Sequence, residues 1–145
     1  QGDWPHLNTL RIIPGNLTPV CSPSYLLEHG NIKAAVDLNQ HILIHEENHL
    51  GWQQWLFKAT GKEMTAIKGF HIDDTNVRMN AVLNGQGVML GCPVLLRPLI
   101  EKKEIVQLFD VYLDEYAYFL AYPTKANLSR QEQDFIDWVA SIAIM

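Results

Sequence analysis

The chain has 145 residues, of which 48% are apolar and 19% charged, so it is sized for a globular domain and not for a disordered tail. Its formal charge of -5, with no cluster of Lys or Arg, excludes the electrostatic footprint of a nucleic-acid-binding domain. The sequence shows no apolar run of membrane-spanning length, no signal-peptide pattern and no C-x-x-C motif, so we expect a soluble cytoplasmic protein with reduced cysteines and no cofactor.

Up to residue 66, the sequence predicts three strands and three helical segments. The strands are β-branched or apolar runs between turn signals, at residues 9–13, 17–21 and 41–45. The helical segments are predicted at residues 24–29, 34–38 and 49–60. Ser22 predicts the cap of the first segment, and Asn48 and Gly61 predict the two ends of the third. One apolar face supports the third helix, formed by Trp52, Trp55, Leu56 and Ala59.

Residues 67–91 are predicted to form a strand, a helix and a second strand. Asp74 or Thr75 caps the helix, Gly85 ends it, and its predicted apolar stripe is Val77, Ala81, Val82 and Leu83. In such a unit the helix start lies at the carboxyl end of the preceding strand, where free amides and the helix dipole favour a polar or anionic guest. Residues 73–76 are therefore a candidate ligand rim, although any α/β protein shows the same pattern.

The last third of the chain continues the alternation. Cys92 and Pro93 open a predicted helix whose core side is Leu95, Leu96, Leu99 and Ile100. Strands are predicted at residues 105–109 and 116–122, and Ser129 and Glu132 predict a capping box ahead of a final helix. The pattern predicts an α/β fold with a mostly parallel sheet, helices on both faces, and ligands at the carboxyl ends of the strands.

Three histidines offer the strongest metal signal, since His41, His45 and His49 would share one face of a helix. The residues between the first two favour a strand, which separates His41 and His45 by roughly 13 Å, too far for one ion. Adjacent carboxylates at residues 46–47 and 73–74 are typical of solvated turns and helix starts. No nucleophile motif is present, so catalysis has no positive support.

Two tryptophans are candidates for stacking on a ligand. Trp55 is predicted to lie in the core. For Trp52, in the first turn of its helix and close to the candidate rim, a core position and a ligand stack remain equally open.

An ordered set of motifs resembles the effector-binding domain of LysR-type transcriptional regulators, in the branch that includes the glycine-cleavage activator. The motifs are G-D-W-P at the start, L-T-P-V-C-S-P at residues 17–23, a D-L followed by a strand ending in His45, W-x-x-W-L-x-x-x-x-G at residues 52–61, F-x-x-D from Phe70, N-G-Q-G-V-M-L-G at residues 84–91 and F-I-D-W-V at residues 135–139. They span nearly the whole chain in the order that the family shows.

The resemblance implies a fold like that of type II periplasmic binding proteins, with two α/β subdomains and a small-molecule cleft. It implies that residues 17–117 form the complete second subdomain, whereas residues 1–16 and 118–145 belong to an incomplete first one. The Gln1 start suggests a fragment that lacks the family's winged helix-turn-helix, and the chain would touch DNA only through that missing domain. The apolar face of the last helix is then expected to be exposed, displaced or buried against another chain.

The resemblance also implies a site and partners. The ligand-binding residues carried over are His45, Glu46, Asn48, Trp52, Asp74, Thr75, Gly91 and Cys92. The expected partners are a small polar metabolite and further copies of the parent protein, as a dimer or tetramer, with no membrane. Two other hypotheses remain: a lobe of an extracytoplasmic solute-binding protein, and a metal-dependent hydrolase that uses the histidines.

Overall fold

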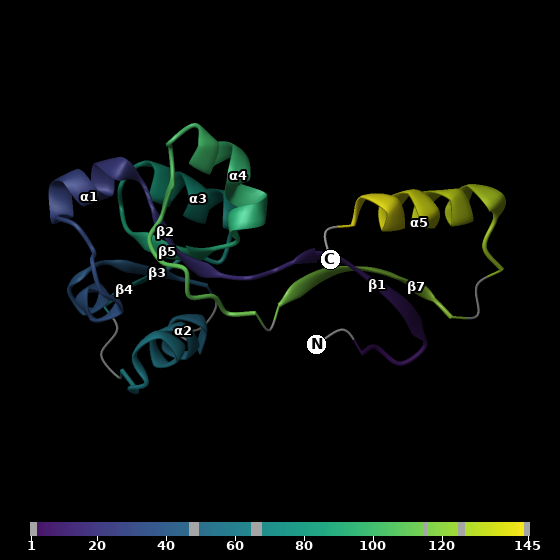
Figure 1. The fold of residues 1–145 in the computed structure, drawn as a ribbon, viewed down its shortest axis with the longest axis horizontal. Coiled ribbons are helices and arrows are strands. Elements are labelled where there is room, and N and C mark those ends of the chain that lie inside the picture. The colour runs from purple at the N-terminus through teal and green to yellow at the C-terminus, as the bar shows by residue number, and fades with distance from the viewer. Residues whose placement is uncertain (1–2, 47–49, 65–67, 115, 125–126, 144–145) are drawn as a thin grey trace. The chain divides into compact units, whose positions relative to one another are not determined.

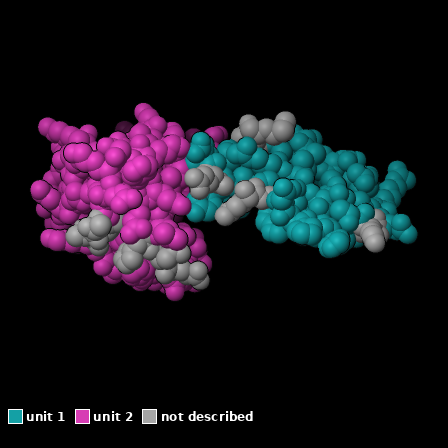
Figure 2. Space-filling view, turned by 90° about the horizontal axis from the view of Figure 1, so that it is seen from below, with its two compact units in different colours: residues 1–16, 114–145 teal, residues 17–113 magenta. Residues whose placement is uncertain are grey.

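The structure is a computed structural model that describes residues 3–46, 50–64, 68–114, 116–124 and 127–143 (Figure 1). Its contacts divide the chain into two compact units (Figure 2). Unit 1 consists of Gln1–Asn16 and Asp114–Met145, and unit 2 consists of Leu17–Leu113. Leu113 forms a β-bridge with Leu17, so the two ends of unit 2 pair with each other. The subdomain boundary at residue 117 stays a prediction.

Unit 2 is built on a five-stranded sheet in the order β4-β3-β5-β2-β6. The strands are β2 (Thr18–Cys21), β3 (Leu43–His45), β4 (Gly69–His71), β5 (Val88–Gly91) and β6 (Val106–Gln107). β3 is parallel to both β4 and β5, whereas β2 is antiparallel to both β5 and β6. Four strands therefore run in one direction and β2 in the other, which confirms the predicted mostly parallel sheet.

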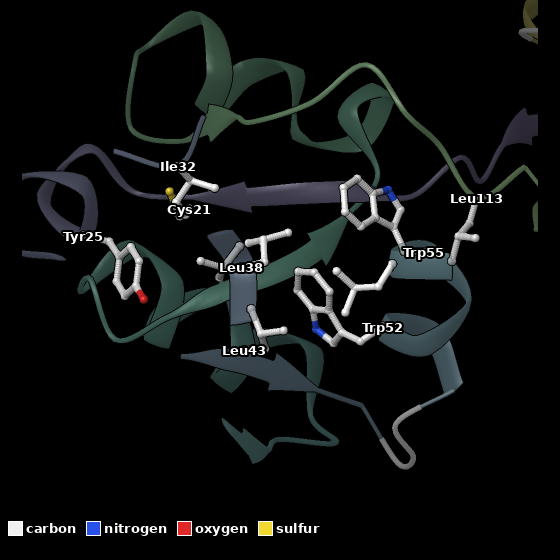
Figure 3. Close-up of a cluster of buried hydrophobic side chains, with 10 residues drawn as sticks. Cys21, Tyr25, Ile32, Leu38, Leu43, Trp52, Trp55 and Leu113 are labelled. Atoms are coloured by element: carbon white, nitrogen blue, oxygen red, sulfur yellow. The ribbon is translucent and has the colours of Figure 1, made fainter. Parts of the chain in front are cut away.

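Helices cover both faces of this sheet. They are α1 (Pro23–His29), the 3-10 helix η1 (Ala35–Gln40), α2 (Leu50–Thr60), α3 (Thr75–Leu83) and α4 (Pro93–Glu101). Because successive strand residues point to opposite faces, Leu43 packs in the cluster under α1, η1 and α2, and Ile44 packs in the cluster under α3 and α4. Figure 3 shows the first cluster, in which Trp52 and Trp55 of α2 lie beside Leu38 and Leu43.

Local capping signals were predicted correctly. The Ser22 hydroxyl accepts from the Tyr25 amide at the start of α1, and the Asp74 carboxylate caps α3. Gly61 and Gly85, at φ +70° and +71°, follow the ends of α2 and α3 in the left-handed conformation that glycine favours. The predicted cap of α2, Asn48, lies outside the described residues.

Two predicted core positions are wrong. Val77 is 55% exposed and Leu95 is 46% exposed. In α3 the buried residues are Arg78, Ala81 and Val82, so the stripe begins one residue later than predicted and begins with a charged side chain. In α4 the fully buried core residue is Leu96 alone, and the side chain of Leu95 points to solvent.

Gly69 allows β4 to approach β3 closely. A Cβ atom at this position would lie 1.7 Å from the Leu43 carbonyl oxygen, far inside any van der Waals contact. Its φ of +153° is also outside the range that other residues adopt readily. The pairing of Leu43 with Gly69, and of His45 with His71 two positions later, therefore depends on the absence of a side chain here.

Unit 1 is a two-stranded antiparallel sheet with one helix. β1 (Leu7–Pro14) pairs with β7 (Ala117–Pro123), and α5 (Arg130–Ile142) contacts β1. Ser129 and Glu132 form the predicted capping box, and its hydrogen bonds from Ser129 lower the pKa of the Glu132 carboxyl. Val139 is buried, whereas Phe135, Trp138 and Ile142 are each more than half exposed. In the single chain, the apolar face of α5 is therefore largely exposed.

Candidate functional site

The carboxyl ends of the parallel strands meet at one edge of the unit 2 sheet. His45 and His71 are register partners at the ends of β3 and β4, and their ring centroids are 5.2 Å apart. Thr18, at the start of β2, pairs with Gly91 at the end of β5, and its hydroxyl donates to the Phe109 carbonyl oxygen at 3.0 Å. We define the strand-end rim as the residues at and directly after these strand ends: His45, Glu46, His71, Ile72, Asp73, Asp74, Thr75, Gly91 and Cys92.

Arg78 joins three parts of this rim, although the sequence did not predict a role for it. The side chain comes from α3 and is 6% exposed. Its Nη1 donates to the carbonyl oxygens of Ile72 and Asp73, at 2.6 and 3.3 Å. Its Nη2 donates to Glu46 Oε1 at 2.7 Å and to Thr75 Oγ1 at 3.5 Å. One guanidinium therefore ties the end of β3 to the end of β4 and the start of α3.

The geometry suits arginine and no other cation. A planar guanidinium presents several N–H groups in a fixed fork, so it can serve two carbonyls and a carboxylate at once. Burial would penalise the charge if these partners were absent. Glu46 remains 65% exposed, so solvent screens its ion pair with Arg78, and the carbonyl bonds carry much of the stabilisation.

Asp74 has a structural role that modifies the predicted rim. Its Oδ1 accepts from the amides of Asn76 and Val77, each at 2.9 Å. These are the first-turn amides that were expected to attract a polar or anionic guest. The carboxylate of the protein itself already occupies them, so an external anion would have to displace it.

Both tryptophans of α2 lie in the core. Trp52 is 2% exposed, and its indole N–H donates to the Ile44 carbonyl oxygen at 2.9 Å. Trp55 is fully buried, and its N–H donates to the Val111 carbonyl oxygen at 2.9 Å. Figure 3 shows the two indoles pointing among other apolar side chains. For Trp52, the core position is therefore the one observed, and its ring offers almost no surface for stacking.

Gly91 and Cys92 lie at the end of β5 and the start of α4. A Cβ at Gly91 would approach the Leu96 and Val20 side chains to 2.6 and 2.8 Å, so the glycine permits close packing of strand against helix. Cys92 is the buried N-cap residue of α4, and its side chain makes no capping hydrogen bond. Strand register places both residues at the same edge as His45.

Of the eight predicted residues, hydrogen bonds and ring contacts connect a subset. Glu46 and Thr75 meet through Arg78, and His45 lies between Ile44 and Glu46 with its buried ring against His71. Asn48 lies outside the described residues. Within the described part of the chain, no group of three His, Cys, Asp or Glu side chains could hold a metal ion.

A shallow groove of about 360 Å³ lies away from the rim, on the outer side of α2 and the loop that follows it. Its lining residues are Gln53, Gln54, Phe57, Glu63 and Met64. None of the predicted ligand residues lines it. Among the described helices, none combines the length and hydropathy that a membrane crossing requires.

Comparison with models of protein families shows the family to which the chain belongs. The family model of the LysR substrate binding domain matches residues 1–143. The chain belongs to the LysR substrate-binding-domain family. Sequence relatives agree with the match: the glycine cleavage system transcriptional activator of Escherichia coli (strain K12) is 28% identical over 145 residues, which cover 99% of this chain and 47% of that protein.

A second relative in this family gives the same picture. The glycine cleavage system transcriptional activator homolog of Haemophilus influenzae is 26% identical over 139 residues, which cover 95% of this chain and 46% of that protein. This LysR substrate-binding domain therefore spans about half the length of the curated relatives it matches.

Solved structures confirm the predicted fold class. The effector domain of the transcriptional regulator AmpR of Pseudomonas aeruginosa matches with a TM-score of 0.82 at 20% identity, covering 97% of this chain and 67% of that one. The regulatory domain of CrgA, a LysR-type transcriptional regulator from Neisseria meningitidis, matches with a TM-score of 0.80 at 15% identity, covering 99% and 72%. The fold of this LysR domain is thus the periplasmic-binding-protein-like α/β fold of type II.

One signal in the sequence could have identified Arg78. Positions 78, 81, 82 and 85 have the i, i+3, i+4, i+7 spacing of a buried face, and Arg78 stands at the first of them. A charged residue at an apolar position of a helix that starts at a strand end indicates buried partners. The predicted stripe begins at Val77 instead, because valine is apolar and the neighbouring Arg78 is charged.

Proposed function

We propose that this LysR domain is the effector-sensing part of a bacterial transcriptional regulator and that it binds a small polar metabolite at the strand-end rim. The family match over residues 1–143 carries the proposal. It is supported by polar groups that gather where parallel strands end, the usual place for ligands in α/β sheets. DNA binding would then belong to a winged helix-turn-helix of the parent protein, and the parent would act in the cytoplasm as a dimer or tetramer.

The proposed ligand contacts come from the eight predicted residues. Glu46 and Thr75 are the strongest candidates, because both are exposed and Arg78 fixes their positions. His45, Asn48, Gly91 and Cys92 stay in the proposal as further contacts. Trp52 and Asp74 would act indirectly, Trp52 by supporting the end of β3 and Asp74 by capping α3. Other groups of the effector site would come from the first subdomain of the parent protein.

The alternatives have less support. A lobe of an extracytoplasmic solute-binding protein would share the fold, but the sequence relatives are named as transcriptional regulators. A metal-dependent hydrolase would need the histidines to converge, and His41 instead bonds to Tyr25. No observation in the described residues favours catalysis.

A ligand screen on the complete effector domain of the parent protein tests the proposal. We expect one class of small polar metabolites to raise the melting temperature by mass action. Thr75→Val should weaken that shift by at least about tenfold in the concentration required, the equivalent of one lost hydrogen bond to a polar ligand. Thr60→Val, at the far end of α2, is the matched control and should leave the shift unchanged.

The same variants should be placed in the full-length regulator and assayed with a reporter gene and a DNA-binding titration. Thr75→Val should abolish the effector response and leave DNA binding intact. An unchanged effector response in the Thr75→Val variant would contradict the proposed ligand site at the strand-end rim. A parent gene that encodes no helix-turn-helix would contradict the proposed role in a transcriptional regulator.

A further inference from the structure

A second polar cluster lies at the amino end of β3, at the opposite end of that strand from the rim. Tyr25 of α1 is fully buried, and its hydroxyl oxygen lies 2.9 Å from the Ile42 amide nitrogen and 3.1 Å from His41 Nδ1. His29, one turn later in α1, stacks on the Tyr25 ring with centroids 4.3 Å apart. Figure 3 shows Tyr25 at one side of the first cluster, of which it is a member.

The donors and acceptors in this cluster fix the form of His41. A backbone amide can only donate, so the Ile42 N–H donates to the Tyr25 oxygen. The hydroxyl proton of Tyr25 then needs an acceptor, because the side chain is 0% exposed. His41 Nδ1 is that acceptor, which requires a neutral imidazole with its proton on Nε2.

Protonation of His41 would break this arrangement. An imidazolium carries N–H groups at both nitrogens, so Nδ1 would present a hydrogen to the Tyr25 oxygen, and the hydroxyl proton would lose its partner in a buried position. A buried donor without an acceptor is more unfavourable than an exposed one by about 1–3 kcal/mol. The contact between α1 and the start of β3 is therefore weaker when His41 is protonated.

The titratable groups around His41 act in both directions. Burial lowers the pKa of His41 from its ordinary 6.5, the positive charge available to His29 lowers it further, and Asp37 of η1 raises it. The Asp37 carboxylate accepts from the Lys33 and Ala34 amides, which lower its own pKa and keep it ionised.

Two more groups complete the surroundings of the cluster. Burial raises the pKa of the Tyr25 hydroxyl and raises that of the neighbouring Cys21 thiol on β2 to about 12, so both stay neutral at any physiological pH. His41 is thus the group of the cluster whose charge changes between neutral and mildly acidic pH.

We propose that Tyr25, His29 and His41 form an acid-sensitive latch that holds α1 against the start of β3, and that protonation of His41 opens it. His29 contributes to the latch by stacking on the Tyr25 ring. The latch acts at the start of the strand that ends at His45.

The sign of the pH dependence follows from linkage. Because the pKa of His41 is lower in the folded chain than in the unfolded chain, the unfolded chain takes up the proton first as pH falls below about 6.5. As the pH falls below that value, the free energy of unfolding therefore decreases. The decrease ends when His41 is protonated in the folded chain as well.

NMR on the full 145-residue chain with 15N- and 13C-labelled histidine tests the latch directly. At pH 7.5 we expect the nitrogen shifts of His41 to show an unprotonated Nδ1 and a protonated Nε2. On acidification His41 should titrate below 6.5, and the Ile42 amide should lose hydrogen-exchange protection over the same range, measured relative to amides in the middle of α2.

Three variants separate the latch from simple burial. Tyr25→Phe keeps the ring and removes the hydroxyl, so the pKa of His41 should rise by roughly half to one pH unit. His29→Gln removes an exposed charge and should also raise it, which gives a second test if Tyr25→Phe does not fold. His6→Asn removes an exposed histidine of unit 1 and should leave the titration of His41 unchanged.

Several results would overturn the latch. These are a protonated Nδ1 at pH 7.5, a His41 titration at or above 6.5 in the original chain, or Ile42 protection that does not follow that titration. A folded Tyr25→Phe variant with an unchanged His41 titration would overturn it as well.

Discussion

Arg78 occupies the first position of the buried stripe of α3, three and four residues before Ala81 and Val82. An apolar residue would bury there without any requirement for partners. Arginine needs them, and it finds them in two carbonyl oxygens, a carboxylate and a hydroxyl that all follow strand ends. Arg78 therefore links Glu46, which follows β3, to residues 72–75, which follow β4.

Replacing Arg78 tests this role. We expect Arg78→Met to lower the free energy of unfolding by about 1–3 kcal/mol, because it keeps the aliphatic stem and removes the donor to the partly buried carbonyl oxygens of Ile72 and Asp73. The free energy of unfolding of Arg78→Lys should lie between those of Arg78→Met and the original chain, since an ammonium carries charge but lacks the planar fork of a guanidinium. Urea unfolding measures both. Arg97→Met on the exposed side of α4 is the control, with an expected change within about 0.5 kcal/mol. If Arg97→Met lowered the free energy of unfolding as much as Arg78→Met, the effect would not come from the specific contacts of Arg78.

The Asp74 cap gives a second prediction at this scale. Asp74→Ala should destabilise the chain by about 1 kcal/mol, because two first-turn amides of α3 lose their acceptor. Asp74→Asn should restore most of that loss, since its amide oxygen accepts the same bonds. Thermal unfolding followed by circular dichroism measures the series, with Asp73→Ala as the exposed neighbour that should have little effect. An equal effect at Asp73 would point to general charge and not to capping.

These two residues show what sequence reasoning could and could not predict. The cap was predictable, because its donors lie two and three residues further along the chain. The role of Arg78 was not, because its carboxylate partner lies 32 positions earlier and reaches it only through the pairing of β3 with β4. Trp52 shows the same limit: helical spacing predicted one face for it, but only the packed structure distinguishes a core position from a ligand stack.

Among the elements, α5 has the clearest imbalance between its sequence and its surroundings. Val139 is 9% exposed, whereas Phe135 and Trp138 are 52% and 58% exposed, with their rings 6.0 Å apart. One line of this helix packs on its own unit, and the adjacent line presents aromatic surface to solvent. The sequence predicted the helix and its capping box correctly, because both depend on local signals.

Substitutions on the two lines of α5 should therefore differ. The double variant Phe135→Ser with Trp138→Ser should change the free energy of unfolding by less than about 1 kcal/mol and should reduce the binding of a hydrophobic dye, because it removes exposed apolar surface. Val139→Ala should lower the free energy of unfolding by about 1–2 kcal/mol and leave dye binding unchanged. A large loss of stability in the double variant would show that the two rings are buried in solution.

The direction of β2 is an element-scale feature that the sequence could not supply. Its residues alternate between the two clusters, with Val20 in one and Cys21 in the other. Alternation of this kind is the same for parallel and antiparallel neighbours. Only the folded sheet shows that β2 is antiparallel to both of its neighbours, β5 and β6.

At the scale of the whole molecule, the two units differ in the size of their hydrophobic cores. Unit 2 has five strands and two hydrophobic clusters, whereas unit 1 has a two-stranded sheet and one helix. Two strands with one helix are marginal in isolation, and three or more strands with helices on both faces are not. The stability of the chain is therefore concentrated in Leu17–Leu113.

Expression of Leu17–Leu113 alone tests this distribution. We expect the excised unit to unfold cooperatively in urea and to keep the far-ultraviolet circular dichroism of its helices, because both clusters lie within it. The variant Trp55→Ala in the same background should be destabilised by about 3–5 kcal/mol, as for other buried aromatic residues. A broad transition without a plateau would show that unit 2 needs residues outside its own boundaries.

The close contact between β3 and β4 limits which amino acids the folded protein can accept at position 69. A methyl group there would overlap the Leu43 carbonyl, so even alanine would push the two strands apart and shift the register that aligns His45 with His71. Gly30 has nothing within 4 Å, but its φ of +89° and ψ of 166° lie in a backbone region that is essentially limited to glycine, so a side chain there is strained even though space is open. In a saturation library selected for folded protein and read by deep sequencing, codon 69 should return glycine alone because of the contact with Leu43, and codon 30 should return mostly glycine because of its backbone conformation.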